Sequence, residues 1–102
     1  MLSKHYAPVT PAFLTNDVQK LIKIFSDRKI GLLLFDREIF DSRIIPQEVL
    51  SASGDLKIAT ANLYAALHRL DNNDLDIIIA ERFPDTGLGI TINDRLQRVT
   101  KK

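Results

Sequence analysis

The sequence has 102 residues, of which 45% are hydrophobic and 26% are charged, and its formal net charge is +1. This length and composition predict one globular domain, and a nearly balanced charge argues against broad electrostatic attraction to nucleic acid or to an anionic membrane. There is no cysteine, which excludes disulfides, a thiol nucleophile and thiolate metal ligands.

The chain also lacks the patterns of membrane proteins and of secreted proteins. Its longest apolar runs, IGLLLF and LDIIIA, are about six residues long, whereas a membrane-spanning helix needs about 20. The first thirty or so residues contain no continuous apolar core of the kind a signal peptide has. We therefore expect a cytoplasmic protein with no membrane partner.

The chain begins with an irregular segment, SKHYAPVTP at residues 3–11. Pro8 and Pro11 fix φ, and each favours extended backbone at the residue before it. No helical or strand period is present. A frayed terminus is one interpretation. We prefer an interdomain linker at residues 1–9, followed by a compact domain at 10–102.

The domain alternates predicted strands and helices. We expect a short strand at 10–14, and then a helix that reaches about residue 28. Its cap is Thr15, Asn16 or Asp17, and its apolar stripe is Val18, Leu21, Ile22 and Phe25. A continuous apolar run at 29–35 predicts a strand covered on both faces. Residues 36–46 stay ambiguous between a loop, a helical turn and an edge strand.

The second half repeats the alternation. We expect a strand at 47–53, a long helix at about 55–70 capped by Asp55 or Ser53, a strand at 75–83 and a loop at 84–89. The stripe of the long helix is Leu56, Ala59, Leu63, Ala66, Leu67 and Leu70. Leu88, Ile92, Leu96 and Val99 predict a last helix. The pattern predicts a three-layer, Rossmann-like α/β domain with a mainly parallel sheet of about four strands and helices on both faces.

Two loops follow predicted strands and precede helices, which is where open parallel sheets bind ligands. They are SASGD at 51–55 and PDTGLG at 84–89. Glycines and hydroxyls beside free helical N–H groups can hold an anion, so the candidate residues are Ser53, Gly54, Thr86, Gly87 and Gly89. The alternative is a tight turn plus a helix cap. GLGITI lacks the third glycine of a dinucleotide fingerprint, and SASGDL lacks the lysine of a P-loop.

No residue set predicts a catalytic or metal site. His5 and His68 are on different elements, and His68 falls off the apolar stripe. The carboxylates of Asp36, Glu38 and Asp41 lack the ligand pattern of a calcium loop. Arg95, Arg98, Lys101 and Lys102 form a basic end that complements the dipole of the last helix or contacts RNA. A binding module is therefore favoured over an enzyme.

Several stretches together resemble one family, the two-domain threonylcarbamoyl-AMP synthases. They are the opening HYAP (5–8), the helical run NLYAAL (62–67), the strand end at Ala80 and Glu81, the turn PDTGLG (84–89) and the helix start INDRL (92–96). The resemblance is to the linker and the small C-terminal domain. It is weakest at 15–29 and 36–46.

The resemblance implies a role. The parent enzymes convert ATP, L-threonine and bicarbonate into threonylcarbamoyl-adenylate, used for threonylcarbamoyl-adenosine in tRNA, in a YrdC-like catalytic domain that is absent from this sequence. His5, Tyr6 and Pro8 would belong to a linker over that active site, with Tyr6 against the nucleotide. The chain alone is then expected to be inactive, with ATP and Mg²⁺ bound by its partner domain and tRNA contacted only indirectly.

Two alternatives stay open. One is a stand-alone nucleotide-binding domain that uses the two glycine turns. The other is a protein-interaction module, for which Tyr64 and Phe83 would contribute an exposed apolar patch.

Overall fold

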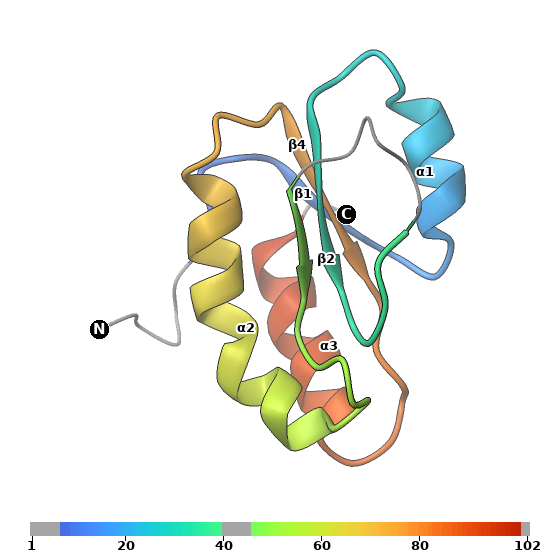
Figure 1. Cartoon of the computed structure of the whole chain (residues 1–102), viewed down its shortest axis with the longest axis vertical. Coiled ribbons are helices and arrows are strands. Elements are labelled where there is room, and N and C mark those ends of the chain that lie inside the picture. Colours follow the sequence, from blue (N-terminus) through green and yellow to red (C-terminus); the bar gives the residue numbers. More distant parts are fainter. Residues whose placement is uncertain (1–6, 40–45, 101–102) are drawn as a thin grey trace.

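A computed structural model describes residues 7–39 and 46–100 of the chain. Figure 1 shows the strands lying between helices. In chain order the elements are β1 (Ala12–Thr15), α1 (Val18–Ile24), β2 (Ile30–Leu34), β3 (Gln47–Val49), α2 (Leu56–Asp71), β4 (Ile77–Glu81) and α3 (Leu88–Val99). This order confirms the predicted α/β alternation.

The four strands form one sheet in the order β1-β4-β2-β3, and every pair is parallel. The connection from β1 to β2 passes over β4, and the connection from β3 to β4 passes back over β2 in the opposite direction. Right-handed crossovers that run in opposite directions place their helices on opposite faces of a sheet. The topology therefore predicts α1 on one face and α2 on the other.

Burial of the strand residues shows these two faces. In β4, Ile77 and Ile79 pack with the α1 residues Val18 and Ile22, whereas Ile78 packs with α2 and α3. The strand β2 alternates in the same way, and all five of its residues are buried. Side chains two residues apart share a face, so a central strand that is apolar throughout supplies both cores, as the sequence predicted.

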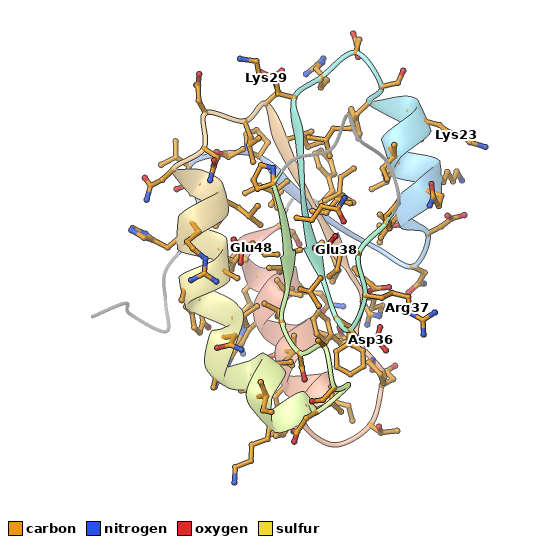
Figure 2. All side chains as sticks on the ribbon, viewed as in Figure 1. Lys23, Lys29, Asp36, Arg37, Glu38 and Glu48 are labelled. Atoms are coloured by element: carbon orange, nitrogen blue, oxygen red, sulfur yellow. The ribbon has the colours of Figure 1, made fainter. Side chains whose placement is uncertain are left out.

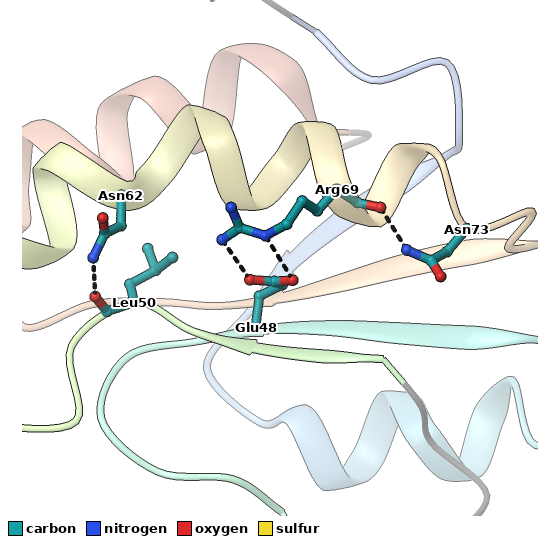
Figure 3. A network of polar contacts seen from close by, with 5 residues as sticks. All are labelled: Glu48, Leu50, Asn62, Arg69 and Asn73. Carbon is teal, nitrogen blue, oxygen red and sulfur yellow. Dashed lines mark hydrogen bonds and ion pairs between the residues drawn. The ribbon is translucent and has the colours of Figure 1, made fainter.

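Helix α2 is stabilised by a cap at its start, by buried side chains along one face, and by hydrogen bonds along one side. The Asp55 side chain caps it, as expected, and the predicted stripe is buried from Ala59 to Leu70. On the side toward β3, Asn62 donates to the Leu50 carbonyl at 2.9 Å, and Arg69 forms a two-point ion pair with Glu48 (Figure 3). The hydrogen bonds from Arg69 to the Glu48 carboxylate raise the pKa of the Arg69 guanidinium above its ordinary value.

Some boundaries differ from the sequence-based expectations. Helix α1 ends at Ile24 in a turn, before the expected residue 28, and β3 has three residues where seven were expected. Residues 36–39 are irregular, and 40–45 lie outside the described residues. Within the described part of the chain, no helix has the length and apolar character to cross a membrane.

The stripe of α3 also differs. Leu88 is 41% exposed, whereas Gly89, Ile92, Asn93 and Leu96 are buried. The expectation for Leu88 was wrong because the first turn of α3 packs through its glycine, which lets the helix approach the preceding backbone closely.

Candidate functional site

The candidate residues lie at two opposite edges of the sheet. Because all four strands are parallel, the turns at 51–55 and 84–89 both follow carboxyl ends and lie at one edge, the lower one in Figure 1. Residues 7–11 precede β1 and therefore lie at the amino edge, close to the end of α2 (Figure 1). The sequence-based candidates thus form two regions, a carboxyl edge and an amino edge.

The polar groups of the 51–55 turn bond mainly to one another. The Ser51 hydroxyl accepts a hydrogen bond from the Asp55 N–H at 2.9 Å and lies 3.2 Å from the Ser53 hydroxyl. The Asp55 carboxylate accepts from the N–H groups of Lys57 and Ile58 at 2.8 and 3.3 Å. A carboxylate already occupies the N-terminus of α2, so a bound anion would compete with Asp55 and meet its negative charge.

Gly54 has the positive φ that this turn needs, +75°. A Cβ at Gly54 would meet no atom within 4 Å. The residue is required for backbone conformation, and nothing packs against it.

The 84–89 turn is closed by backbone contacts. Gly89 N donates to the Thr86 carbonyl at 2.9 Å, and Ile90 N donates to the Gly87 carbonyl at 3.2 Å. Gly87 adopts φ 51° and caps α3 without a side-chain hydrogen bond. A Cβ at Gly89 would overlap the Pro84 carbonyl oxygen. The two glycines therefore have different purposes, since Gly87 supplies a left-handed conformation and Gly89 supplies close approach.

Asn93 is a structural residue of this turn that sequence reasoning missed. Its buried side chain accepts a hydrogen bond from the Phe83 N–H at 2.8 Å and donates to the Phe83 carbonyl at 2.9 Å. The amide pairs with the chain as a neighbouring strand would, just beyond the end of β4. The residue pattern gave no signal for this role, because the helical period assigned Ile92 and not Asn93 to the core.

The amino edge holds the segment that the sequence predicted as a linker. The Ile78 N–H donates to the Pro11 carbonyl at 2.8 Å, which joins the segment to the sheet. Before Pro11, Val9 and Thr10 are bound by the carboxylate of Asp71. Residues 1–9 and 10–102 were the predicted linker and domain. Of the linker candidates, Pro8 is half-buried, and His5 and Tyr6 lie outside the described residues.

The remaining candidates that the structure describes do not come together into a site. Asp36 lies 3.8 Å from Arg37, and Figure 2 shows both with Glu38 along the connection after β2, while Asp41 is not described. Over residues 7–39 and 46–100, no three His, Cys, Asp or Glu side chains are placed to hold a metal ion. His68 is exposed on α2.

Among the described residues, the basic end and the aromatic candidates do not gather into one patch. Arg98 pairs with Asp94 at 3.1 Å within α3, and the Arg95 guanidinium lies 5.9 Å from the centre of the Tyr64 ring. Lys101 and Lys102 are outside the described residues. Phe83 is only 3% exposed, so it cannot form the exposed apolar patch considered with Tyr64.

Comparison with known proteins identifies a family that this chain matches. The family described as "Threonylcarbamoyl-AMP synthase, C-terminal domain" matches residues 1–100. A threonylcarbamoyl-AMP synthase from Bacillus subtilis (strain 168) is 33% identical over 103 aligned residues. The match covers 92% of this chain and 29% of that protein, so the chain spans less than a third of this curated relative.

A solved structure shares the fold. It is the crystal structure of P. abyssi Sua5 complexed with L-threonine, which aligns with a TM-score of 0.71 and 24% sequence identity. The alignment covers 93% of this chain and 29% of that one. The predicted Rossmann-like α/β architecture is therefore confirmed by a known example.

Proposed function

This chain belongs to the family of threonylcarbamoyl-AMP synthase C-terminal domains, and from that premise we propose that it is the accessory domain of such an enzyme. It anchors a linker that closes over the active site of a YrdC-like catalytic domain, on the same chain or a separate one. Resemblance to the family assigns that partner domain the synthesis of threonylcarbamoyl-adenylate from ATP, L-threonine and bicarbonate, with Mg²⁺. The product serves tRNA modification, and this domain contacts tRNA only through its partner.

The observation that carries the proposal is how residues 7–11 leave the domain. Their side chains are exposed or half-buried. The last carbonyl of the segment, that of Pro11, accepts a hydrogen bond from the Ile78 N–H of β4. The domain therefore holds one end of the segment and leaves it outside both hydrophobic cores. A segment carrying Pro8 and Pro11 has few conformations to lose when it closes over a ligand.

In this proposal the contact with the bound nucleotide comes from linker residues. His5, Tyr6 and Pro8 precede the anchored part, and in the proposed arrangement Tyr6 lies against the nucleotide with His5 beside it. An aromatic ring provides a surface on which the nucleobase can stack, and it helps to exclude water from the reacting groups. The domain itself performs no chemistry in this proposal, and its contribution is to limit where the linker can go.

A domain-joining experiment tests this. The catalytic domain of a threonylcarbamoyl-AMP synthase would be assayed for adenylate formation alone, mixed with this chain, and joined to it. The matched control joins the same two domains with residues 1–8 replaced by Gly and Ser. We expect the native linker to raise activity by about 100-fold over the Gly/Ser linker, since misplaced active-site groups cost about that much. Equal activity of the two joined proteins would contradict the proposal.

A further inference from the structure

Asp71, the last residue of α2, binds Val9, the last residue of the predicted linker, and Thr10, the first residue of the predicted domain. Its Oδ2 accepts from the Val9 N–H at 3.1 Å, and its Oδ1 accepts from the Thr10 N–H at 2.9 Å and the Thr10 hydroxyl at 2.8 Å. Asp71 lies more than sixty positions away from Val9 and Thr10 in the chain. Hydrogen bonds to an ionised carboxylate are stronger than those between neutral groups, so this contact holds the segment firmly for its size.

The position of Asp71 is unfavourable for the helix itself. The C-terminus of a helix carries a partial negative charge, so cations are favoured there and an aspartate is not. His68 and Arg69 in the same turn follow that preference, and Asn72 provides the cap. Asp71 departs from it and accepts hydrogen bonds from Val9 and Thr10. A residue that breaks a local rule while binding a distant segment is a candidate for a functional role.

Two prolines bracket the bound residues. Pro8 precedes Val9 and Pro11 follows Thr10, so φ is fixed on both sides of the contact, and Thr10 is restricted to extended backbone because a proline follows it. Rotation at Val9 and Thr10 is the main freedom left to this stretch, and the Asp71 carboxylate holds the N–H of both. Binding at these two positions therefore sets the direction in which the chain leaves the domain at Ala7.

We propose that Asp71 is a positioning residue, a latch whose carboxylate fixes the exit direction of the linker by binding Val9 and Thr10. It touches neither substrate nor cofactor. Its effect on catalysis rests on the proposed function, because it acts only if the linker closes an active site. Its effect on the linker itself does not depend on that function.

Amide hydrogen exchange of the 102-residue chain, resolved by NMR, tests the latch. In Asp71→Ala we expect the Val9 and Thr10 amides to exchange at least about tenfold faster, because each loses a charge-assisted hydrogen bond. Core amides away from the segment, such as that of Leu50, which donates to the Leu34 carbonyl, should change less than twofold. Unchanged exchange at Val9 and Thr10 would overturn the latch.

Asp71→Asn provides a sharper variant. Its remaining oxygen can still accept from both Thr10 donors, while its NH₂ group faces the Val9 N–H, which is also a donor. We expect the Val9 amide to lose protection and the Thr10 amide to keep it. The matched control is Asp74→Asn, which removes the same charge three residues away and should alter neither amide. Equal loss of protection in the control would show that charge alone is responsible and would overturn the latch.

A kinetic measurement separates the latch from the proposed function. In the chain joined to a catalytic domain, we expect Asp71→Ala to raise KM for ATP about tenfold and to leave kcat within twofold, because a linker with no fixed direction retains ATP poorly. Faster amide exchange with unchanged KM would retain the latch and contradict the lid role. Slow exchange with altered KM would overturn the latch and leave the lid role standing.

Discussion

Helix α2 has an aspartate at each end, and the two use the same chemistry for different purposes. Asp55, just before the helix, accepts hydrogen bonds from N–H groups of the helix's own first turn. Asp71, at the last position, accepts them from the separate segment that holds Val9 and Thr10. The Asp55 carboxylate stabilises the start of its own helix. The Asp71 carboxylate joins the end of the helix to the segment that precedes β1.

The same contrast extends to the two edges of the sheet. At the carboxyl edge, where α/β sheets commonly bind ligands, Ser51, Asp55 and Asn93 form hydrogen bonds within the fold, as in the pairing of Asn93 with Phe83. At the amino edge, residues 7–11 are exposed or half-buried, and they are held by the Asp71 carboxylate and by the hydrogen bond from the Ile78 N–H to the Pro11 carbonyl. The edge that resembles a binding site by position is used for structure, and the opposite edge carries the proposed function.

Gly89→Ala should have the largest effect on stability. Its Cβ would overlap the backbone carbonyl of Pro84, which cannot rotate away as a side chain could. We expect a loss of about 3 kcal/mol in the free energy of unfolding and a fall in Tm of roughly 12–24 °C. The matched control is Gly54→Ala, which has open space and only an unfavourable φ, and should lose about 1 kcal/mol. Equal losses would mean that close packing does not define this edge.

Asn93→Leu should come next. The substitution keeps the approximate size of the side chain and leaves the N–H and carbonyl of the buried Phe83 without their partner, at a cost of about 2 kcal/mol in urea unfolding. Asn62→Leu is the comparison, because Asn62 is exposed and loses one bond to the Leu50 carbonyl. It should lose less than about 1 kcal/mol. A larger loss at Asn62 than at Asn93 would contradict the structural role of the Asn93 pair.

The two aspartates of α2 give the third prediction. Asp55→Ala should lower the free energy of unfolding by about 1 kcal/mol, because it removes a helix cap. Asp71→Ala should lower it by less than about 0.5 kcal/mol, because relief of the unfavourable charge at the helix C-terminus offsets the lost hydrogen bonds. Chemical denaturation of both variants measures the difference. If Asp71→Ala lowers the free energy of unfolding more than Asp55→Ala does, the proposed contrast between the two aspartates is wrong.

Titration of the isolated chain with ATP should show the smallest effect. Since Asp55 occupies the N-terminus of α2, calorimetry should detect no saturable binding tighter than about 1 mM. Tight binding that disappears in Gly87→Val, with the fold intact by circular dichroism, would instead support the alternative of a stand-alone nucleotide-binding domain.

The fold was largely predictable because its strongest determinants are local. The apolar runs within 29–35 and 75–83 are typical of strands covered on both faces, and the stripe of α2 has a clear helical period. The weaker boundaries failed for physical reasons. Phe25 continued the period of α1 by its spacing, yet the helix ends at Ile24, because an apolar side chain packs equally well from the turn that follows.

The site was harder to predict because its determinants are long-range. The sequence DNND at 71–74 favours a turn, and nothing near it indicates that Asp71 meets Thr10 across the domain. Likewise, a helical period assigned Leu88 to the core and could not identify Asn93 as a buried amide. In both cases the partner is backbone from a distant or neighbouring segment, which residue patterns do not reveal.

The most direct test of the central claim is hydrogen exchange of the linker in this chain joined to a threonylcarbamoyl-AMP synthase catalytic domain. Mass spectrometry of the peptide spanning residues 1–11 would be compared without ligand and with ATP plus L-threonine. If the linker closes over the active site, the ligands should slow exchange across residues 1–8 severalfold, and Tyr6→Ala should weaken that protection. If the peptide exchanges equally fast with and without ligands, while the catalytic domain itself becomes protected, the linker does not close and the account is wrong.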